Sequence, residues 1–357
     1  MTTSISVCGY GTGCGDAEPV EGMMTMPPVP PPSRPTDYEG IREVTGALTA
    51  TCVISGSAVS LAVADGESVL VGFNSTDNKI TLNANNASGQ PCEFAATSKL
   101  ALTASGSAVA TGRTVILDYS NGLFLKGNTT PGITIDFTIG VGTSNSTDTV
   151  QVRGSAGVDR FTAGAGTVVG VRTINVNAGS TAGFDSLVDV TIKSIETLVF
   201  SSGADDDVLS GQGGLGTGVV YPAAMQFFGG AGNDSITGSN ANDLITGGED
   251  DDVIDGAGGN DTHKMGTAAE GSDTINVIIT PTGSDIVDYG LRTTDLTIAA
   301  DGTATSGAAG EGDTINNKVV TIIGGAGNDT ISIASGSTVN HTVSAGAGDD
   351  TFTGGGA

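Results

Sequence analysis

The chain lacks tryptophan, has few other aromatic residues and contains no long apolar run. Aromatic residues make up 4% of its 357 residues, so a core built mainly on large rings is excluded. No stretch approaches the ~18 consecutive apolar residues of a membrane-spanning helix, and we expect no transmembrane segment. The N-terminus, MTTSISVCGYGTGCGD, has no basic start followed by an apolar run. As written, it is therefore not expected to be a signal peptide.

Basic residues are also scarce. The chain has 13 Lys and Arg against 39 Asp and Glu, for a net charge of -26. Residues 1–150 hold 13 of the acids and 6 of the bases, so most of the negative charge lies in residues 151–357, nearly all of it as aspartate. Such a surface repels nucleic acid and anionic lipid, which bind through Lys and Arg, and it attracts cations. We therefore expect no nucleic-acid partner.

Most of the 11 prolines and all four cysteines lie in the N-terminal part of the chain. Residues 1–44 include MTMPPVPPPSRPTDYEG and are predicted to form a proline-rich tail or linker, because proline supports neither a helix interior nor a central strand. The even number of cysteines (Cys8, Cys14, Cys52 and Cys92) is compatible with two disulfides in an oxidising compartment, or with free thiols. Cys52 and Cys92 are candidates for a pair.

Residues 45–150 have the pattern of an all-β domain. VSLAVADGESVLVGF predicts a strand, an Asp-Gly turn and a strand, and TVILDYSNGLFLKG repeats that pattern around Asn121-Gly122. KITLN and ITIDFTIG predict further strands. The sequence favours a small domain that is either β-sandwich-like or a β-solenoid, and a carbohydrate- or protein-binding sandwich is one interpretation of it.

Glycine, by contrast, is abundant, with 57 residues. Residues 229–264 divide into four blocks of nine: GGAGNDSIT, GSNANDLIT, GGEDDDVID and GAGGNDTHK. Glycine opens each block and aspartate is sixth in each. Further copies are GSAGVDRFT at 154–162, SGADDDVLS at 202–210, GGAGNDTIS at 324–332 and AGAGDDTFT at 345–353. Partial copies occur at 271–275, 283–287 and 311–315. We therefore predict one repeat domain over residues 151–357, with a core array at 229–264 and strand-like inserts such as KVVTII.

Each block contains six loop residues and three strand residues. We expect glycines at positions one, two and four to permit positive φ, and position eight (Ile236, Ile245, Ile254) to point inward. Two blocks make one coil of eighteen residues, which places Asp234 over Asp252 and Asp243 over Asp261. Strands stack ~4.8 Å apart, and two carboxylates at about that distance repel by about 3 kcal/mol. A cation is needed between them, and a set of oxygen ligands suits Ca²⁺ better than Zn²⁺ or Mg²⁺.

These blocks resemble the G-G-x-G-x-D-x-U-x nonapeptide of the RTX, or haemolysin-type, calcium-binding repeats. The resemblance extends to SIETLVFSSGADDDVLSG at 194–211, a stretch similar to those that often lead into such repeats, and is absent from residues 1–150. It implies an all-β fold with a parallel β-roll that holds Ca²⁺ between successive loops. The implied metal-binding residues are Gly230, Gly232, Asp234, Asp243, Gly248, Asp250, Asp252, Gly259, Asp261, Gly325, Gly327, Asp329 and Asp350.

Some positions depart from the repeat. Ser239 and Ala241 stand where glycine is expected, and Asp250 occupies the fourth position of its block. His263 stands at the inward apolar position of the fourth block, and we expect the roll to end or open there.

No other motif predicts a catalytic or nucleotide-binding site. GQGGLG at 211–216 matches G-x-G-x-x-G, but an acidic run precedes it and no helix cap follows, so we expect a roll loop there. The chain has neither H-E-x-x-H nor G-x-S-x-G, and we predict no catalytic residues, no enzyme activity and no cofactor other than Ca²⁺.

We therefore expect an extracellular or cell-surface calcium-binding protein with a structural or adhesive role, in a surface layer, a matrix or an adhesin. Its repeat domain would fold on Ca²⁺ binding after export. Besides calcium ions, the candidate partners are copies of the chain itself and cell-surface glycans. The alternative function is an accessory calcium-binding region of a secreted protease, lipase or polysaccharide-modifying enzyme.

Overall fold

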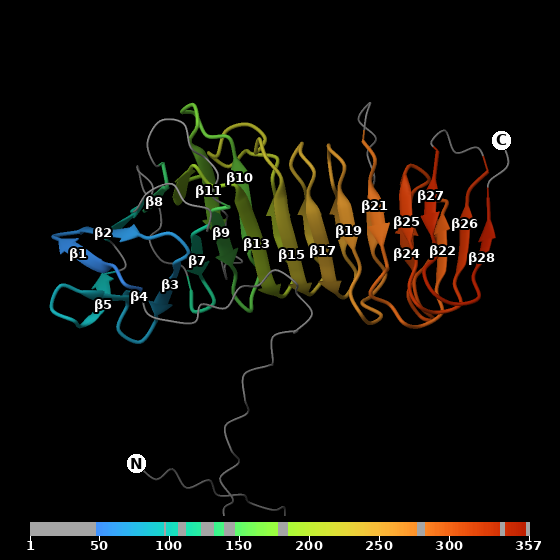
Figure 1. Ribbon diagram of the computed structural model, residues 1–357, viewed down its shortest axis with the longest axis horizontal. Helices are drawn as coiled ribbons and strands as arrows, with labels where there is room; N and C mark the ends of the chain where they lie inside the picture. The colour runs from blue at the N-terminus through green and yellow to red at the C-terminus, as the bar shows by residue number, and fades with distance from the viewer. Residues whose placement is uncertain are drawn as a thin grey trace, which may run out of the picture. The chain divides into compact units, whose positions relative to one another are not determined.

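Short β-strands follow one another through all the described parts of the chain. The computed structural model describes residues 48–95, 98–105, 112–122, 132–138, 147–177, 185–276, 283–335 and 340–354, and these residues contain strands and loops but no helix. The predicted tail at 1–44, with Cys8 and Cys14, lies outside the described residues. From Glu39 to Ala357 the chain forms one compact unit, in which successive strands stack side by side from β1 to β28 (Figure 1).

Sheet A consists of parallel strands, each paired with the sheet A strand of the next coil. Its strands, in stacking order, are β3 (Ser68–Asn74), β7 (Thr114–Asp118), β9 (Thr149–Arg153), β13 (Thr197–Ala204), β15 (Met225–Ala231), β17 (Leu244–Glu249), β19 (Thr262–Lys264), β21 (Ile286–Asp288), β25 (Thr321–Ile323) and β27 (Thr342–Ser344). Sheet A thus extends from the first coils to the last.

Sheet B faces sheet A and is also mostly parallel, with one antiparallel insertion, β12-β11-β10. Its strands, in stacking order, are β2 (Ala58–Val63), β6 (Lys99–Ala104), β8 (Ile133–Asp136), β12 (Val190–Lys193), β11 (Arg172–Asn177), β10 (Arg160–Gly164), β14 (Val208–Ser210), β16 (Ser235–Thr237), β18 (Val253–Asp255), β20 (Thr274–Asn276) and β24 (Asp313–Ile315). Sheet C is a shorter parallel stack of β22 (Thr297–Ala300), β26 (Thr330–Ile333) and β28 (Thr351–Thr353).

Antiparallel strands accompany both parallel stacks. Near the N-terminal end, β1 (Thr51–Ser55) pairs with β2, and β4 (Lys79–Asn86) lies between β3 and β5 (Pro91–Ala95). Further along, β23 (Ala304–Ser306) pairs with β24. Cys52 in β1 and Cys92 in β5 form a buried disulfide, which confirms this predicted pair.

The predicted coil of eighteen residues is confirmed in the core array. Phe227 in β15 pairs with Ile245 in β17, and Ile236 in β16 pairs with Ile254 in β18. These isoleucines are at most 1% exposed, as predicted for position eight, and burying each one contributes about 1.5–3 kcal/mol. The fold class predicted from the repeat, an all-β parallel roll, is therefore confirmed.

The prediction that the roll ends or opens at His263 is wrong. His263 in β19 pairs in parallel with Ile245 on one side and Val287 on the other, and sheet A continues to β27. The side chain is fully buried. What changes here is the apolar core, which is divided into one cluster that ends at Ile254 and another that begins at Met265. Backbone pairing thus carries the roll past a polar inward residue.

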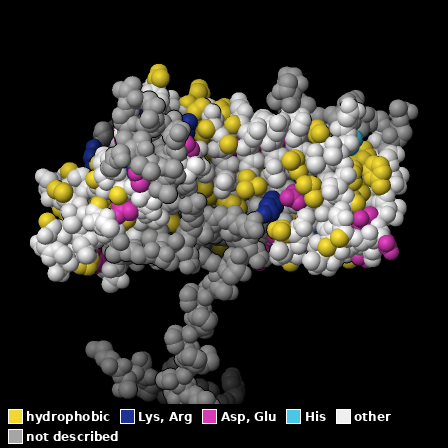
Figure 2. All heavy atoms as spheres, in the orientation of Figure 1, with side chains coloured by type: hydrophobic (Ala, Val, Ile, Leu, Met, Phe, Trp, Pro, Cys, Tyr) yellow, Lys and Arg dark blue, Asp and Glu magenta, His cyan; other side chains and the backbone are white. Residues whose placement is uncertain are grey.

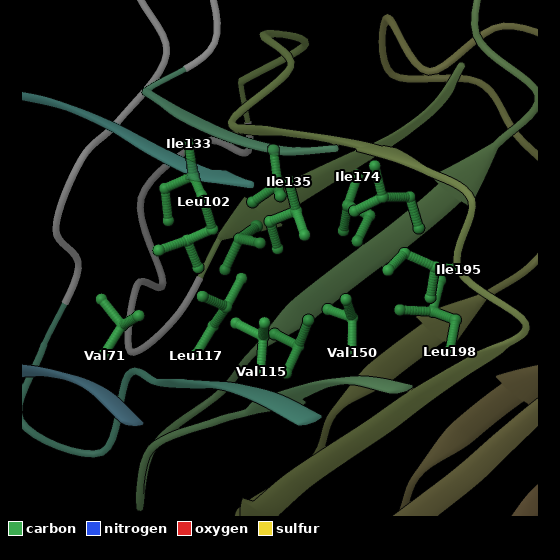
Figure 3. Close-up of a cluster of buried hydrophobic side chains, with 14 of the residues drawn as sticks. Val71, Leu102, Val115, Leu117, Ile133, Ile135, Val150, Ile174, Ile195 and Leu198 are labelled. Carbon is green, nitrogen blue, oxygen red and sulfur yellow. The ribbon is translucent and has the colours of Figure 1, made fainter. Parts of the chain in front are cut away.

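The two sheets also continue through the predicted boundary at residue 150, which lies inside β9. In Figure 3, Val71, Leu117 and Val150 of sheet A point toward Leu102 and Ile133 of sheet B, and these side chains belong to one buried cluster. The N-terminal coils therefore have the parallel stacking of a solenoid.

The Asp-Gly turn predicted between two strands forms at 64–67, where the N–H of Glu67 donates to the carbonyl oxygen of Ala64. It joins β2 to β3 and so connects sheet B to sheet A, without pairing the two strands. The strand predicted after Asn121-Gly122 lies outside the described residues. GQGGLG at 211–216 is a loop between β14 and β15, as predicted.

Candidate metal centre

A row of aspartates lies along the loops that run from sheet A to sheet B, which we call A-to-B loops. Each stands at the start of a sheet B strand, and its backbone N–H donates to Oδ1 of the equivalent aspartate one coil further on. The pairs, donor first, are Asp159 and Asp207 (2.6 Å), Asp207 and Asp234 (2.8 Å), Asp234 and Asp252 (2.8 Å), Asp252 and Asp273 (3.0 Å), and Asp273 and Asp313 (3.0 Å). We call this row the A-to-B ladder, and it contains the predicted stack of Asp234 on Asp252.

The loops that run from sheet B back to sheet A, the B-to-A loops, carry a second row of the same kind, the B-to-A ladder. Its pairs, donor first, are Arg113 and Asp148 (2.7 Å), Asp148 and Glu196 (2.9 Å), Met225 and Asp243 (2.7 Å), Asp243 and Asp261 (2.8 Å), and Asp261 and Asp285 (2.9 Å). Before sheet C, Leu296 donates to Asp329 (3.0 Å) and Asp329 to Asp350 (2.9 Å). The predicted stack of Asp243 on Asp261 is also present.

A further set of bonds comes from the residue before each aspartate, which the sequence reasoning did not single out. Oδ1 of Asn233 accepts the N–H of Asp251 (2.9 Å), and Oδ1 of Asn260 accepts the N–H of Ser284 (2.9 Å). In both cases the donor lies one coil further on, so these bonds run opposite to the aspartate bonds. The signal was available in the sequence, because three of the four blocks at 229–264 contain Asn-Asp.

The first glycine of each block makes room for the carboxylate of the same block. A Cβ on Gly229 would overlap Oδ2 of Asp234, and a Cβ on Gly247 would overlap Oδ2 of Asp252. Neither glycine has positive φ, whereas Gly230 and Gly248 at the second position do (131° and 130°). Our expectation of positive φ at position one was therefore wrong, since glycine is needed there for space.

The ladder aspartates differ in what surrounds the second carboxylate oxygen. Oδ2 of Asp243 accepts the N–H of Ser239 (2.5 Å), and Oδ2 of Asp159 accepts the N–H of Ser155 (2.6 Å). Within the described residues, three consecutive members of the A-to-B ladder have a buried Oδ2 without any hydrogen-bond donor: Asp207, Asp234 and Asp252. Because a buried charge without a partner is strongly unfavourable, these oxygens fit a site that holds a cation.

Burial makes these carboxylates hard to ionise. It raises the pKa of Asp207 to about 8, of Asp234 to about 7 and of Asp252 to about 9, and neighbouring carboxylates add to each shift. On the B-to-A ladder, burial raises the pKa of Asp243 to about 6 and of Asp261 to about 8. Asp207 and Asp252 therefore retain their protons at neutral pH unless a cation takes their place. The acids on the face shown in Figure 2 form only small separate groups, whereas the ladder aspartates of the core array are buried.

The other predicted positions lie in the same loops. Each predicted glycine lies against loop backbone one coil earlier: Gly230 against Gly203, Gly232 against Asp205, Gly248 against Gly230, Gly259 against Ala241, Gly325 against Arg292 and Gly327 against Thr294. Asp250 is exposed with φ 76°. Asp329 is buried, and Asp350 is half-buried. No group of three or more His, Cys, Asp or Glu side chains converges on one point in the described parts of the chain.

Three segments of the chain, residues 228–262, 320–339 and 340–357, match the family described as RTX calcium-binding nonapeptide repeat (4 copies). The chain carries RTX calcium-binding repeats. They cover residues 229–262 of the predicted core array at 229–264, and the repeats bind Ca²⁺. No curated protein matches the chain. Within the described residues, no helix is long and apolar enough to cross a membrane.

The ladder continues beyond the matched RTX segments. Asp159, Asp207, Asp273 and Asp313 lie outside them yet make the same backbone bonds. The sequence showed complete or partial copies around each of these residues but gave no reason to treat them as part of one row. The family match thus covers only a part of a longer structural array.

Proposed function

We propose that this protein is an extracellular structural or adhesive component whose RTX roll folds when calcium binds after export. The observation that carries the proposal is the run of three buried, unpartnered carboxylate oxygens on Asp207, Asp234 and Asp252. Calcium bound in these loops supplies positive charge between stacked carboxylates. Oxygen ligands at this density suit Ca²⁺, and one of the matched RTX segments contains Asp234 and Asp252.

The ladder makes folding of these coils sensitive to calcium concentration. To stack, each carboxylate must leave water and approach the next, and without a compensating cation this costs several kcal/mol per charge. Extracellular calcium modules bind at roughly 10⁻⁴–10⁻³ M, far above cytosolic calcium. The core coils would therefore remain unfolded and competent for export inside the cell, then fold outside it.

Two observations support an extracellular location and a structural role. The buried disulfide between Cys52 and Cys92 is typical of an oxidising compartment. The same two-sheet stack continues through the N-terminal coils and the RTX coils, which gives the unit a repetitive architecture suited to spanning distance.

The second candidate, an accessory region of a secreted enzyme, has less support. A cavity of about 640 Å³ is lined by the β10–β11 turn together with Arg172 and Glu196. Both side chains have structural roles: Nη1 of Arg172 donates to the carbonyl oxygen of Ile195 (2.7 Å), and Glu196 accepts the N–H of Asp148. We therefore assign the cavity no catalytic role.

Circular dichroism of the whole chain in a chelator, in Ca²⁺ and in Mg²⁺ tests the folding claim. We expect β ellipticity to fall in the chelator, to recover in millimolar Ca²⁺ and not to recover in Mg²⁺. Asp252→Asn should require roughly tenfold more Ca²⁺, because each ligand charge contributes to affinity. Asp301→Asn is the matched control, since Asp301 is exposed and outside the ladders. A β spectrum that is unchanged in the chelator would contradict coupled folding.

Sedimentation velocity and a glycan array, both in Ca²⁺, test the biological role. Growth of the sedimentation coefficient with protein concentration would support a surface lattice or matrix, and selective glycan binding would support an adhesin. A monomer that binds no glycan, but restores activity to a co-exported enzyme, would favour the accessory role.

A further inference from the structure

Two arginines are buried inside the solenoid. Arg113 is 0% exposed and Arg292 is 1% exposed, although arginine is almost never fully buried unless paired. Each guanidinium lies beside two carboxylates from other loops. Both arginines also lie outside the segments that match RTX repeats. Fixed positive charge is therefore placed in parts of the solenoid where the repeat pattern is absent.

Arg113 occupies a ladder position. Its backbone N–H donates to Oδ1 of Asp148 (2.7 Å), the same bond that Asp243 makes to Asp261 (2.8 Å). Its guanidinium then reaches Oδ2 of Asp148 (3.3 Å) and the carboxylate of Asp65. Oδ2 is the atom that has no donor in Asp234 and Asp252. At this coil the chain itself provides the positive charge.

Arg292 plays the same part at the other end of the RTX core. Its carbonyl oxygen lies against Gly325 at the second position of a repeat loop. Nη2 contacts Oε1 of Glu311 (2.8 Å) and Oε2 of Glu270 (3.6 Å), both in neighbouring A-to-B loops. Close by, the hydroxyl of Tyr289 donates to Oδ2 of Asp313 (2.6 Å), the last aspartate of the A-to-B ladder.

The acids without partners lie between these two arginines. Oδ2 of Asp207, Asp234 and Asp252 has no hydrogen-bond donor. At the flanks, Oδ2 of Asp148 accepts a hydrogen bond from Arg113, and Oδ2 of Asp313 accepts one from Tyr289. From this distribution we infer that Arg113 and Arg292 act as built-in cations, so that the coils around them fold without calcium, whereas the coils at about 202–264 depend on it. The inference rests on the proposed calcium-coupled folding and specifies where it applies.

A folded N-terminal flank would give the calcium-dependent coils a template. In a solenoid each coil contacts only its neighbours, so a coil that folds onto an existing edge avoids the cost of starting a new stack. The edge offered here is β9 of sheet A, on which β13 pairs in parallel. The disulfide between Cys52 and Cys92 links β1 to β5 in the same N-terminal flank.

Hydrogen exchange of the whole chain, resolved by peptide, tests the inference. We expect β7 and β9 to stay protected in a chelator, as in 10 mM Ca²⁺. Amides of β16 and β18 should exchange about 10- to 100-fold faster in the chelator, as follows from site affinities of roughly 10⁻⁴–10⁻³ M. Loss of protection in β7 and β9 together with β16 and β18 would overturn the inference alone. Retained protection in β16 and β18 would instead overturn calcium-coupled folding.

Variants of Arg113 supply a second measurement. Arg113→Met removes the guanidinium beside the buried Asp148 and the half-buried Asp65, so exchange of β7 and β9 in the chelator should accelerate about 100-fold or more. Arg113→Lys keeps the charge and should retain most of the protection. Lys79→Met removes a base from exposed ion pairs and serves as the matched control. Unchanged protection in Arg113→Met would contradict the role of the guanidinium.

Discussion

Ser239 donates both its backbone N–H and its hydroxyl to the carboxylate of Asp243, at 2.5 Å and 3.1 Å. Serine stands here at the second repeat position, where the RTX pattern has glycine. Asp243 therefore has donors that Oδ2 of Asp234 and Asp252 lacks. The backbone bond also forms where glycine is present, from Gly325 to Asp329 (2.8 Å), so the hydroxyl bond is what the departure from the repeat adds.

Removing this hydroxyl should destabilise the roll. Ser239→Ala eliminates a bond to a buried carboxylate, and we expect a loss of about 1.5–3 kcal/mol in the free energy of unfolding. Urea unfolding in saturating Ca²⁺ measures this loss. Ser235→Ala, at an exposed outward position of β16, should change stability by less than about 0.5 kcal/mol. Equal effects of the two substitutions would contradict the role given to Ser239.

Asp234 and Asp243 should respond differently to loss of charge. Asp234→Asn removes an oxygen without a donor and should weaken calcium binding about tenfold or more, because charged ligands set the affinity. Asp243→Asn affects a carboxylate that already has donors, and the loss should be clearly smaller. Isothermal titration calorimetry of both variants compares the two sides, and an equal loss would argue against the assignment.

Protons should partly replace calcium in stabilising the fold as the pH falls. Because burial raises the pKa of Asp252 to about 9 and of Asp207 to about 8, from 3.8, the folded calcium-free roll binds more protons than the unfolded chain between these values. The stability that these two carboxylates contribute to the calcium-free fold is thus fully present below about pH 4 and is lost as pH rises through about 8–9. Circular dichroism in a chelator between pH 9 and pH 5 measures this dependence. The β signal should grow as the pH falls, and a signal that does not change with pH would contradict the shifts.

His263 should make the roll sensitive to acid. The ring is fully buried, its two nitrogens have no hydrogen-bond partner in the described residues, and burial lowers its pKa to about 4 from 6.5. The neutral ring is favoured in the fold, so its contribution to stability is complete above about pH 6.5 and falls as pH drops toward 4.

His263→Ile should therefore stabilise the roll by about 1–3 kcal/mol at neutral pH, because an unsatisfied buried polar group is removed. The gain should be larger at pH 5. Thermal unfolding in Ca²⁺ at pH 7.5 and pH 5 measures both values. A gain that does not grow at pH 5 would show that ring protonation is not involved.

Gly247→Ala tests the space beside Asp252. The new Cβ would overlap Oδ2 of Asp252, so the carboxylate must move and calcium binding should weaken about tenfold or more. Gly72→Ala adds a methyl group 3.3 Å from Oγ1 of Thr81, away from the ladders, and should leave calcium binding unchanged. Calcium titrations of both variants, followed by circular dichroism, provide the comparison.

The repeat period was enough to predict the coil, but not the state of each loop. Spacing alone placed Asp234 over Asp252, because side-chain direction and coil length follow from the period. Spacing could not show that Oδ2 of Asp243 has a donor while Oδ2 of Asp234 has none, because this difference depends on the loop conformation that places the N–H of Ser239 beside Asp243. Nor could it show that Arg113 joins a ladder, because its contacts with Asp65 and Asp148 span 48 and 35 residues.

The predicted end of the roll at His263 failed for a related reason. Side-chain polarity was taken as a stop signal, but the coil is also held by backbone pairing and by the bond from Asp261 to Asp285. These forces do not depend on which residue points inward. Local polarity therefore changes the stability of a coil without ending the stack.

The hydrogen bonds made by an Asn and by the Asp that follows it run in opposite directions between neighbouring coils. This arrangement affects how the chain can gain or lose coils. Asn233 accepts from the coil after it, and Asp234 donates its N–H to the coil after it while its own carboxylate accepts from the coil before. Coils with an Asn-Asp pair thus present the same acceptors and donors to whichever coil adjoins them. Duplication or deletion of eighteen residues would preserve every lateral bond type, so molecules of this design can be lengthened or shortened in whole coils.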